Sequence, residues 1–271
     1  MMVSIKREGE VLNDKFALHM ILNSIRRANV KFSKKYGTMV ICCDAKKNWR
    51  NDEFEFYKWK RKQDRKESDV DWKLIYKCLD FVKDALDADF PYSVITVDNA
   101  EADDVIGALA RYATENDKNT VIVSNDKDFI QLHSKYVCQF RPIDQGFVRE
   151  LEPKAFLKEL VLRGDKDDGV PNIKSDDNHF TIAGKRQKSM FAKEVDVWKY
   201  EDNEDSIPKE FINNYYRNQR LIDLTFTPES IKVDSVEQFI AGRQRANKPK
   251  MTKFFMKHQL RYLHERINDF I

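Results

Sequence analysis

The sequence predicts an α/β fold: a parallel sheet flanked by helices, followed by a mostly helical C-terminal region. Three short apolar runs carry this prediction, namely TMVICC before Asp44, YSVITV before Glu101 and TVIVS before Asp126. The runs are rich in Val and Ile and are separated by helix-like stretches, which is typical of buried strands in a parallel sheet. Beyond Pro153 the pattern becomes mostly helical. We therefore expect an α/β domain at residues 1–150 and a helical domain at residues 151–271.

Apolar periodicity and stop signals predict the elements around these strands. A long helix is expected from Asp14 to Tyr36, with Gly37 as its C-terminal stop. Residues 46–71 are polar, basic and aromatic, and we expect a mobile loop there in the absence of nucleic acid. The polar stretch 175–206 has no clear period and is expected to contain loops. Further helices are predicted at 72–86, 101–115, 154–162, 208–218 and 254–267, and further strands at 120–124 and 136–140.

Composition narrows the class of protein. The chain has 271 residues and a formal charge of only +3, yet 34% of its residues are charged, so the local arrangement of charge matters more than the sum. Its four cysteines, Cys42, Cys43, Cys78 and Cys138, form no CxxC pair and are expected to be reduced core thiols. No apolar stretch is long enough to cross a bilayer, and the N-terminus lacks a signal-peptide core. We expect a cytoplasmic protein that does not bind membranes.

Eight carboxylates follow the apolar runs or a later turn, in four clusters. Ligands of parallel sheets bind outside the carboxyl ends of the strands, so the acids are expected to converge on one mouth. Carboxylates packed that closely raise each other's pKa unless hard divalent cations neutralise them. Two Mg²⁺ ions about 4 Å apart would activate a water and stabilise the leaving oxygen in phosphodiester hydrolysis. The clusters are Asp44; Glu101, Asp103 and Asp104; Asp126 and Asp128; Asp165 and Asp168.

Each cluster alone also has an ordinary explanation. Acids at 101–104 suit the first turn of a helix, where the helix dipole favours them, and the pair Asn125-Asp126 suits a turn. Their coincidence at three strand ends favours the metal site. The fourth cluster is the most specific, because residues 164–173 read GDKDDGVPNI, in which Gly169 and Pro171 predict a tight turn. A turn that presents backbone N–H groups can hold a phosphate or help to coordinate a cation.

This turn resembles the GDxxDNxPGVxG signature of the 5′-nuclease superfamily, which comprises flap endonucleases, polymerase-associated 5′ nucleases and phage exonucleases. AEADD at 100–104 and SNDKDF at 124–129 resemble the other acidic motifs of that family, in the same order. HMILNSI at 19–25 and CDAK at 43–46 make the chain most similar to the ribonucleases H of T-even-like phages. The resemblance covers residues 14–173 well and the C-terminal third only loosely.

The resemblance implies a PIN-like sheet, a helix–two-turns–helix motif at about 155–190 that grips duplex backbone, and a metal-dependent 5′-3′ nuclease. Such an enzyme removes RNA primers and adjacent DNA from 5′ ends during lagging-strand replication. Two Mg²⁺ ions are implied, for which Mn²⁺ can substitute, with K⁺ at the helix–two-turns–helix. Gly169 replaces the customary Asn and Asn172 the customary Gly, a departure at the gripping turn. The implied metal-holding residues, direct or through water, are Asp44, Glu101, Asp103, Asp104, Asp126, Asp128, Asp165 and Asp168.

A basic and aromatic stretch, FEFYKWKRKQDRK at 54–66, contains a single Asp. Its aromatic rings suit stacking on bases and its cations suit phosphates, although a lone charge run is more often a solvated loop. In the family this segment forms the arch over the active site, where one Lys touches the scissile phosphate. Lys58 fits that role best, with Lys60 and Arg61 as alternatives; the implied catalytic set is Lys58, Asp44, Asp126 and Asp128. The implied nucleic-acid-binding residues are Tyr57, Lys58, Trp59, Lys60, Arg61, Lys62, Gly169, Val170 and Lys174.

A second basic run, from Arg243 to Lys257, contains no acid. It suits duplex phosphate, a partner protein or a solvated surface equally well. The expected partners are nucleic acid (an RNA–DNA hybrid, or duplex DNA with a 5′ end, fork or flap), a single-strand-binding protein and a sliding clamp. The chain is expected to be a monomer, in the host cytoplasm if it is phage-encoded.

The family begins with a strand that ends in Asp, but only MMVSIKREGEVLN precedes the first predicted helix. We therefore expect the first strand and one metal-shell carboxylate to be missing from this sequence. The explanations are a start codon placed too far downstream, which we favour, a shortened chain, or a split enzyme. The missing Asp supports an alternative function, a catalytically weakened or inactive protein that binds junctions or flaps. A PIN-like ribonuclease is a third possibility, against which the GDKDDGVP turn argues.

Overall fold

The computed structural model describes residues 14–200, 206–242 and 247–271. The chain divides into two compact units. Unit 1 consists of Met1–Cys43, Asp71–Ile95 and Glu237–Ile271, and unit 2 of Asp44–Val70 and Thr96–Val236. The expected absence of a first strand concerns residues 1–13, which lie outside the described residues.

Unit 1 is built on two long helices and a pair of short strands. Helix α1 (Asp14–Tyr36) ends, as predicted, before Gly37, whose φ of 85° suits a residue without a Cβ. Helix α4 (Trp72–Asp89) begins after Asp71, which accepts a hydrogen bond from the Leu74 N–H. Strands β1 (Val40–Cys42) and β2 (Ser93–Ile95) pair in parallel.

The C-terminal helices complete the core of unit 1. The sequence predicts one helix at 254–267, but the structure has α10 (Lys248–Lys257), α11 (Arg261–His264) and a 3₁₀ helix, η6 (Ile267–Phe270). The break falls at Gln259, whose φ is 52°. It lets the aromatic rings of Phe254, Phe255 and Phe270 pack with Phe90 in one buried cluster.

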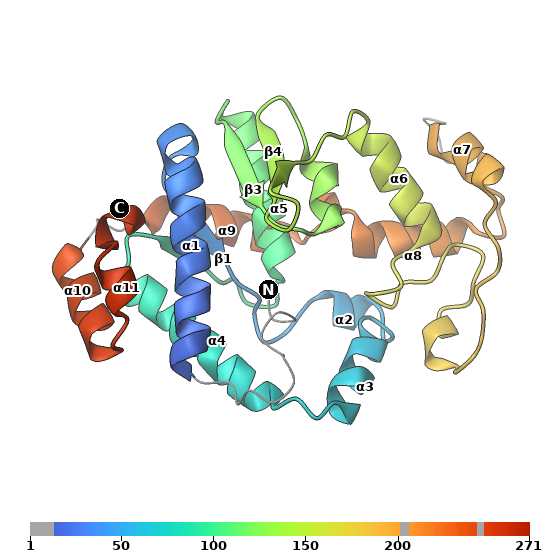
Figure 1. Ribbon diagram of the computed structural model, residues 1–271. Helices are drawn as coiled ribbons and strands as arrows, with labels where there is room; N and C mark the ends of the chain where they lie inside the picture. Colours follow the sequence, from blue (N-terminus) through green and yellow to red (C-terminus); the bar gives the residue numbers. More distant parts are fainter. Residues whose placement is uncertain (1–13, 201–205, 243–246) are drawn as a thin grey trace. The chain divides into compact units, whose positions relative to one another are not determined.

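Unit 2 contains the second sheet. Strand β3 (Thr120–Val123) pairs in parallel with β4 (Val137–Arg141), and β4 pairs antiparallel with β5 (Gly146–Phe147). Helix α5 (Ala102–Glu115) packs beside β3 and β4, as Figure 1 shows. The 3₁₀ helix η2 (Lys127–Leu132) follows β3 and buries Phe129 against Ile122 and Val137.

The rest of unit 2 is helical, in agreement with the sequence prediction. Helix α6 (Pro153–Arg163) lies close to its predicted bounds, whereas α8 (Ile212–Ile222) begins and ends four residues later than the predicted helix at 208–218. The structure adds helices that the sequence prediction lacked: α7 (Ala192–Tyr200), η3 (His179–Thr181), η5 (Leu224–Phe226) and α9 (Glu229–Ala241), within which the division between the units falls. Leu162, Ile173 and Val195 are fully buried in the core among α6, α7 and α8.

The basic stretch at 46–71 is folded, contrary to the expectation of a mobile loop. It forms α2 (Arg50–Glu53) and α3 (Trp59–Glu67). The sequence of α3 carries no apolar stripe, and none of its residues is buried. Only the good intrinsic helix propensity of Lys, Arg, Gln and Glu therefore favours a helix there. Phe54 and Tyr57 anchor the segment because both rings are buried in the core of unit 2.

The architecture is thus mixed α/β, with short parallel strands and many helices, as predicted. The strands lie in two sheets, β1–β2 in unit 1 and β3–β4–β5 in unit 2. None of the described helices combines the length and the apolar character that crossing a bilayer demands.

Candidate active site

All eight predicted acids belong to unit 2. A small cavity of about 20 Å³, enough space for a single water-sized particle, is lined by side chains from three of the four acidic clusters. Asp44, Asp104 and Asp126 do not line it. The charged and phenolic residues that line it are Arg50, Tyr57, Glu101, Asp103, Asp128, Asp165 and Asp168. The structure therefore brings acids that are more than 60 positions apart in the sequence to one place, as the sequence analysis expects.

Asp44 and Asp126 lie at the ends of the segments that follow β1 and β3. Asp44 is exposed, and its Oδ1 accepts a hydrogen bond of 2.8 Å from the Ala102 N–H at the start of α5. Asp126 is also exposed, and its Oδ1 accepts a hydrogen bond of 3.0 Å from the Asp128 N–H, which shapes the turn into η2. Each acid keeps one carboxylate oxygen outside these bonds.

Asp103 is the acid whose surroundings least favour its charge. Burial raises the pKa of Asp103 to about 8, with further increases from the charges of Asp126, Glu101 and Asp44. The Lys58 ammonium lowers the pKa of Asp103 but does not compensate for these effects. A carboxyl group with such a pKa is a natural ligand for a divalent cation, because the cation stabilises the ionised form.

Asp128 supplies the clearest sign that a group is to be bound here. Burial, followed by the charges of Asp126, Asp165 and Asp168, raises the pKa of Asp128 to about 7. Its Oδ1 is buried and has no hydrogen-bond partner. An unpartnered buried oxygen is costly, and a bound cation is one way to satisfy it.

Asp165 is held by the turn that the sequence singled out. Its Oδ1 accepts hydrogen bonds from the N–H groups of Asp167 (2.8 Å) and Asp168 (3.2 Å), and its Oδ2 pairs with Lys127 at 2.9 Å. Burial alone would raise the pKa of Asp165, but Lys127 and the two N–H groups bring it below its ordinary value. The turn requires Gly164, because a Cβ there would lie 2.3 Å from the Val170 carbonyl oxygen.

The start of α3 reaches into this acidic cluster. Lys58 pairs with Glu101 and lies 3.7 Å from Asp168 Oδ2, and Arg61 pairs with Asp168 Oδ1 at 3.1 Å. The Lys58 backbone N–H donates to the Asp168 carbonyl oxygen at 2.8 Å. The predicted arch thus contacts the predicted turn through both side chains and backbone.

Tyr57 differs from its expected role. Its ring is only 2% exposed, and its hydroxyl lies 2.9 Å from both Glu101 Oε2 and Asp168 Oδ2. In this conformation the ring cannot stack on a base. Tyr57 instead joins two of the predicted metal-holding acids through one hydroxyl group.

The other predicted nucleic-acid-binding residues fall into two sets. Lys60 and Lys62 are exposed on α3, with Trp59 half-buried beside them, and are accessible to a ligand. In the turn, Val170 is 1% exposed and Lys174 binds both oxygens of Glu194 (2.7 and 2.9 Å), so these two side chains serve the protein's own packing in this conformation.

Asp104 is the predicted metal-holding acid that the structure sets apart. It is fully buried, and it accepts hydrogen bonds from Arg50, Trp49, Thr227 and the Glu101 N–H. Burial alone would raise the pKa of Asp104, but the bonds from Arg50 and Thr227 bring it below its ordinary value. Sequence reasoning missed Arg50, Trp49 and Thr227, since nothing distinguishes one Arg in KNWRNDE from its exposed neighbours.

The donor set fits a divalent cation. Carboxylate oxygens are the ligands that Mg²⁺ and similar hard ions prefer, and the unpartnered Asp128 Oδ1 and the raised pKa of Asp103 both call for a positive charge. Across residues 14–200, 206–242 and 247–271, however, no three Asp, Glu, His or Cys side chains stand in the arrangement of a finished metal site. Lys58, Arg61 and Lys127 occupy carboxylate oxygens that an ion would need.

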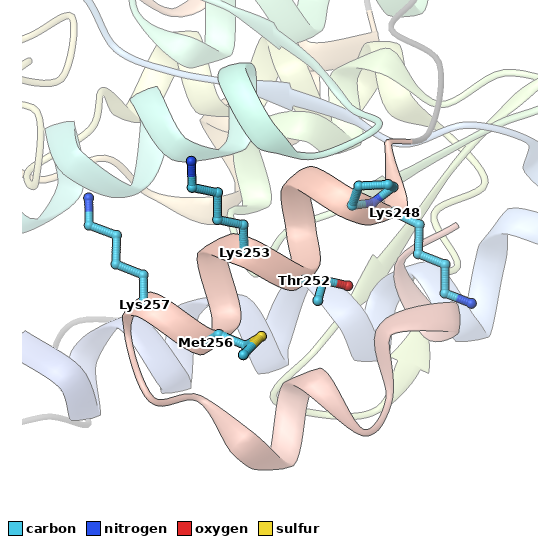
Figure 2. Close-up of a pocket in the computed structure, with 6 residues that line it drawn as sticks. Lys248, Thr252, Lys253, Met256 and Lys257 are labelled. Carbon is cyan, nitrogen blue, oxygen red and sulfur yellow. The ribbon is translucent and has the colours of Figure 1, made fainter.

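The second basic run lies partly in α10. This part of unit 1 has an open hollow of about 650 Å³ (Figure 2). The hollow is lined by Lys248, Pro249, Thr252, Lys253, Met256 and Lys257. Met256 is 66% exposed. Arg243 and Arg245 of the same run lie outside the described residues. The three predicted possibilities for this run, phosphate, a partner protein or solvent, stay open.

Two family models match the sequence. Residues 6–160 match the model for the N-terminal, resolvase-like domain of 5′-3′ exonucleases. Residues 154–270 match the model for the C-terminal region of T4 ribonuclease H. A ribonuclease H of Enterobacteria phage T4 is 32% identical over 275 residues, which cover 97% of this chain and 89% of that protein. A 5′-3′ exonuclease of Buchnera aphidicola is 26% identical over 59% of this chain and 56% of its own length.

Solved structures share the fold. A bacteriophage T5 flap endonuclease variant, in a pseudo-enzyme–product complex with DNA and metal ions, superposes with a TM-score of 0.60 at 15% identity, covering 82% of this chain and 91% of that one. The T5 protein co-crystallised with metal ions gives a TM-score of 0.60 at 16% identity, covering 91% and 95% of the two chains. The arrangement of helices and strands described above is therefore that of a 5′-nuclease fold.

Proposed function

Because the chain belongs to the family of 5′-3′ exonucleases with a resolvase-like N-terminal domain, we propose that it is a divalent-metal-dependent 5′ nuclease. The observation that carries this proposal is the cavity that Asp103 and Asp128 both line, with one oxygen of Asp128 buried and unpartnered. Two carboxyl groups with raised pKa values beside lysine and arginine suit a site that binds divalent cations and a phosphodiester together.

We assign the metal-holding role to seven of the eight predicted acids. Asp104 is left out because its oxygens are already occupied by protein donors. Bound divalent cations, Mg²⁺ or Mn²⁺, would supply an activated water and neutralise charge on the phosphate. The seven acids are Asp44, Glu101, Asp103, Asp126, Asp128, Asp165 and Asp168.

The chain's own cations are assigned to the substrate. Lys58 and Arg61, at the start of α3, lie within reach of the cavity and would contact the scissile phosphate once they leave Glu101 and Asp168. Lys60 and Lys62 would bind neighbouring phosphates, and Trp59 would stack on a base. Contacts of this kind recognise the shape and the phosphate charge of a nucleic acid, with little preference for particular bases.

The family and the T4 relative support a more specific substrate. We propose that the protein trims RNA primers and adjacent DNA from 5′ ends or flaps during replication, leaving 5′-phosphate and 3′-hydroxyl ends. We also propose that a K⁺ ion binds at the predicted helix–two-turns–helix motif, residues 155–190. The proposed protein partners are a single-strand-binding protein and a sliding clamp.

The test is cleavage of 5′-labelled substrates. An RNA–DNA hybrid and a 5′-flap DNA duplex are incubated with the protein in Mg²⁺, with EDTA as the control. Asp126→Asn and Asp128→Asn should each lower the cleavage rate about 100-fold or more, because each change removes a charge from the metal-holding set. Mg²⁺-dependent cleavage at the parent rate by both variants would refute the proposed function.

The same experiment distinguishes the alternative, a junction-binding protein without full catalytic competence. One observation favours it, since the described residues hold no finished three-ligand metal site. In that case the labelled flap duplex should be retained in a gel-shift assay, but no shorter product should appear in Mg²⁺ or Mn²⁺.

A further inference from the structure

A buried ion pair, Arg50–Asp104, adjoins the acidic cavity, which Arg50 itself lines. Asp104 is 0% exposed and Arg50 2% exposed. The two planar groups meet edge to edge, since Arg50 Nη2 donates to Asp104 Oδ1 at 2.8 Å and Nη1 donates to Oδ2 at 2.9 Å. Such bidentate pairs fix orientation as well as distance.

The remaining capacity of the Asp104 carboxylate is also filled. Oδ1 accepts a bond of 2.7 Å from the Thr227 hydroxyl, and Oδ2 accepts bonds from Trp49 Nε1 (3.2 Å) and the Glu101 N–H (3.0 Å). An ionised carboxylate offers about four acceptor positions, and five hydrogen bonds reach this one. No position is left for a cation.

Arg50 connects the pair to other parts of unit 2. Its Nε donates to the Leu221 carbonyl oxygen at 2.8 Å, in the last turn of α8. Its Nη1 also contacts Glu101 Oε2 at 3.2 Å, on the cavity side. One guanidinium group therefore holds α2, α8 and the beginning of α5 together.

Holding Asp104 determines where its neighbours point. Successive residues of a helix are turned by about 100° around its axis, so fixing Asp104 toward Arg50 and Thr227 fixes the direction of Asp103. Asp103 then lines the cavity, together with Glu101, whose backbone N–H is bonded to Asp104. The pair sets the rotation of the α5 start about its own axis.

We propose that Arg50 and Asp104 are positioning residues, which aim Asp103 and Glu101 at the divalent cations, and that Asp104 is not itself a metal ligand. This inference rests on the proposed function. A role in stability alone is a different claim, because well-packed apolar groups replace many buried ion pairs without loss of stability. The two roles can therefore be separated by replacing both members at once.

The experiment compares the parent protein with the double variant Arg50→Met, Asp104→Leu. Urea unfolding measures stability, and isothermal titration with Mn²⁺ in the absence of nucleic acid measures metal affinity. We expect the double variant to unfold near the parent's urea midpoint but to bind Mn²⁺ about 10-fold to 100-fold more weakly, as for other groups that orient metal ligands. A folded double variant with the parent's Mn²⁺ affinity would overturn the inference.

If the double variant does not fold, Arg50→Lys decides the question. Lysine keeps the buried charge but cannot bond both Asp104 oxygens, Glu101 and the Leu221 carbonyl in the same geometry. Weaker Mn²⁺ binding by this folded variant supports positioning, and unchanged binding overturns it. Failure of the parent itself to bind Mn²⁺ would instead refute the proposed function, so the two failures are distinguishable.

Discussion

The ammonium group of Lys58 lies against the carboxylate of Glu101 and 3.7 Å from that of Asp168. A cation of the protein thus stands between two acids that we assign to divalent ions. Lys58 is the first residue before α3 and has a φ of 54°, so the backbone turns there to aim the side chain inward. Lysine and metal ion would compete for the same oxygens.

Lys58→Met should therefore change metal binding and cleavage in opposite directions. Without the competing ammonium group, Mn²⁺ should bind roughly tenfold more tightly, a gain of about 1.4 kcal/mol. Cleavage should fall about 100-fold, because the phosphate loses its positive partner. Titration calorimetry and flap cleavage measure the two effects. Lys60→Met is the matched control, since Lys60 is exposed on the same helix; an equal gain in Mn²⁺ affinity there would contradict the competition.

Tyr57→Phe separates two roles for this ring. If the hydroxyl serves Glu101 and Asp168, its removal should lower the free energy of unfolding of the metal-free protein by about 1–2 kcal/mol. Saturating Mg²⁺ should reduce this difference, because the ions then satisfy both acids. If the ring instead stacks on a base, phenylalanine should preserve stability in both conditions. Urea unfolding with and without Mg²⁺ gives the answer.

Stability of the metal-free protein should depend on pH through Asp103 and Asp128. Their pKa values are raised from 3.8 to about 8 and about 7, so between pH 4 and pH 8 the folded protein holds protons that the unfolded chain has released. The contribution of these groups is therefore present at low pH and is lost as the pH rises through their folded pKa values. The free energy of unfolding should therefore fall as the pH rises from about 4 to 8.

A double variant isolates that contribution. Asp103→Asn with Asp128→Asn should flatten the fall in unfolding free energy between pH 5 and pH 8, measured by urea unfolding in EDTA. Mg²⁺ should stabilise the parent more at pH 8 than at pH 5, since binding requires the ionised acids. A parent profile that matches the double variant's across this range would show that the two acids do not titrate as described.

Gly169 and Gly184 form a matched pair of glycines. Their φ angles are 73° and 74°, but a Cβ at Gly169 would lie 2.9 Å from the Phe56 carbonyl oxygen, whereas one at Gly184 would meet nothing within 4 Å. Gly184→Ala should cost about 1 kcal/mol of unfolding free energy, for the backbone conformation alone. Gly169→Ala should cost about 3 kcal/mol, because it also separates the arch from the turn. If urea unfolding shows equal losses of unfolding free energy for the two variants, the contact between residue 169 and the Phe56 carbonyl oxygen relaxes without an energetic cost.

The acids could be proposed from the sequence because most of them follow a strong local signal. The strands before Asp126 and Glu101 are apolar and β-branched, and the turn at Asp165 is marked by glycine and proline. The rule for parallel strands led to the expectation that these acids converge, although the two strands belong to different sheets. The separation of Asp104 from its neighbours could not be predicted. It depends on Arg50 being buried, and on Thr227, more than 120 positions away in the sequence, reaching the same carboxylate.

The helices of the basic segment were missed for a related reason. Helix α3 is anchored at one end by Phe54 and Tyr57 and exposes the rest, so the periodic burial that identifies a helix is absent. The break at Gln259 was missed because a non-glycine residue there adopts a positive φ, which no local pattern announces.

The contacts of Arg50 with Leu221 and of Asp104 with Thr227 bear on how the protein can be divided. The first family match ends at residue 160, which invites expression of that segment as a free-standing nuclease. A gene fragment cut there would encode Glu101, Asp103 and Asp128 of the cavity, but it would lack Asp165 and Asp168 and also Leu221 and Thr227. The boundary between the two family matches is thus a boundary of sequence similarity, and a truncated protein would carry an incomplete set of acids without the contacts that orient them.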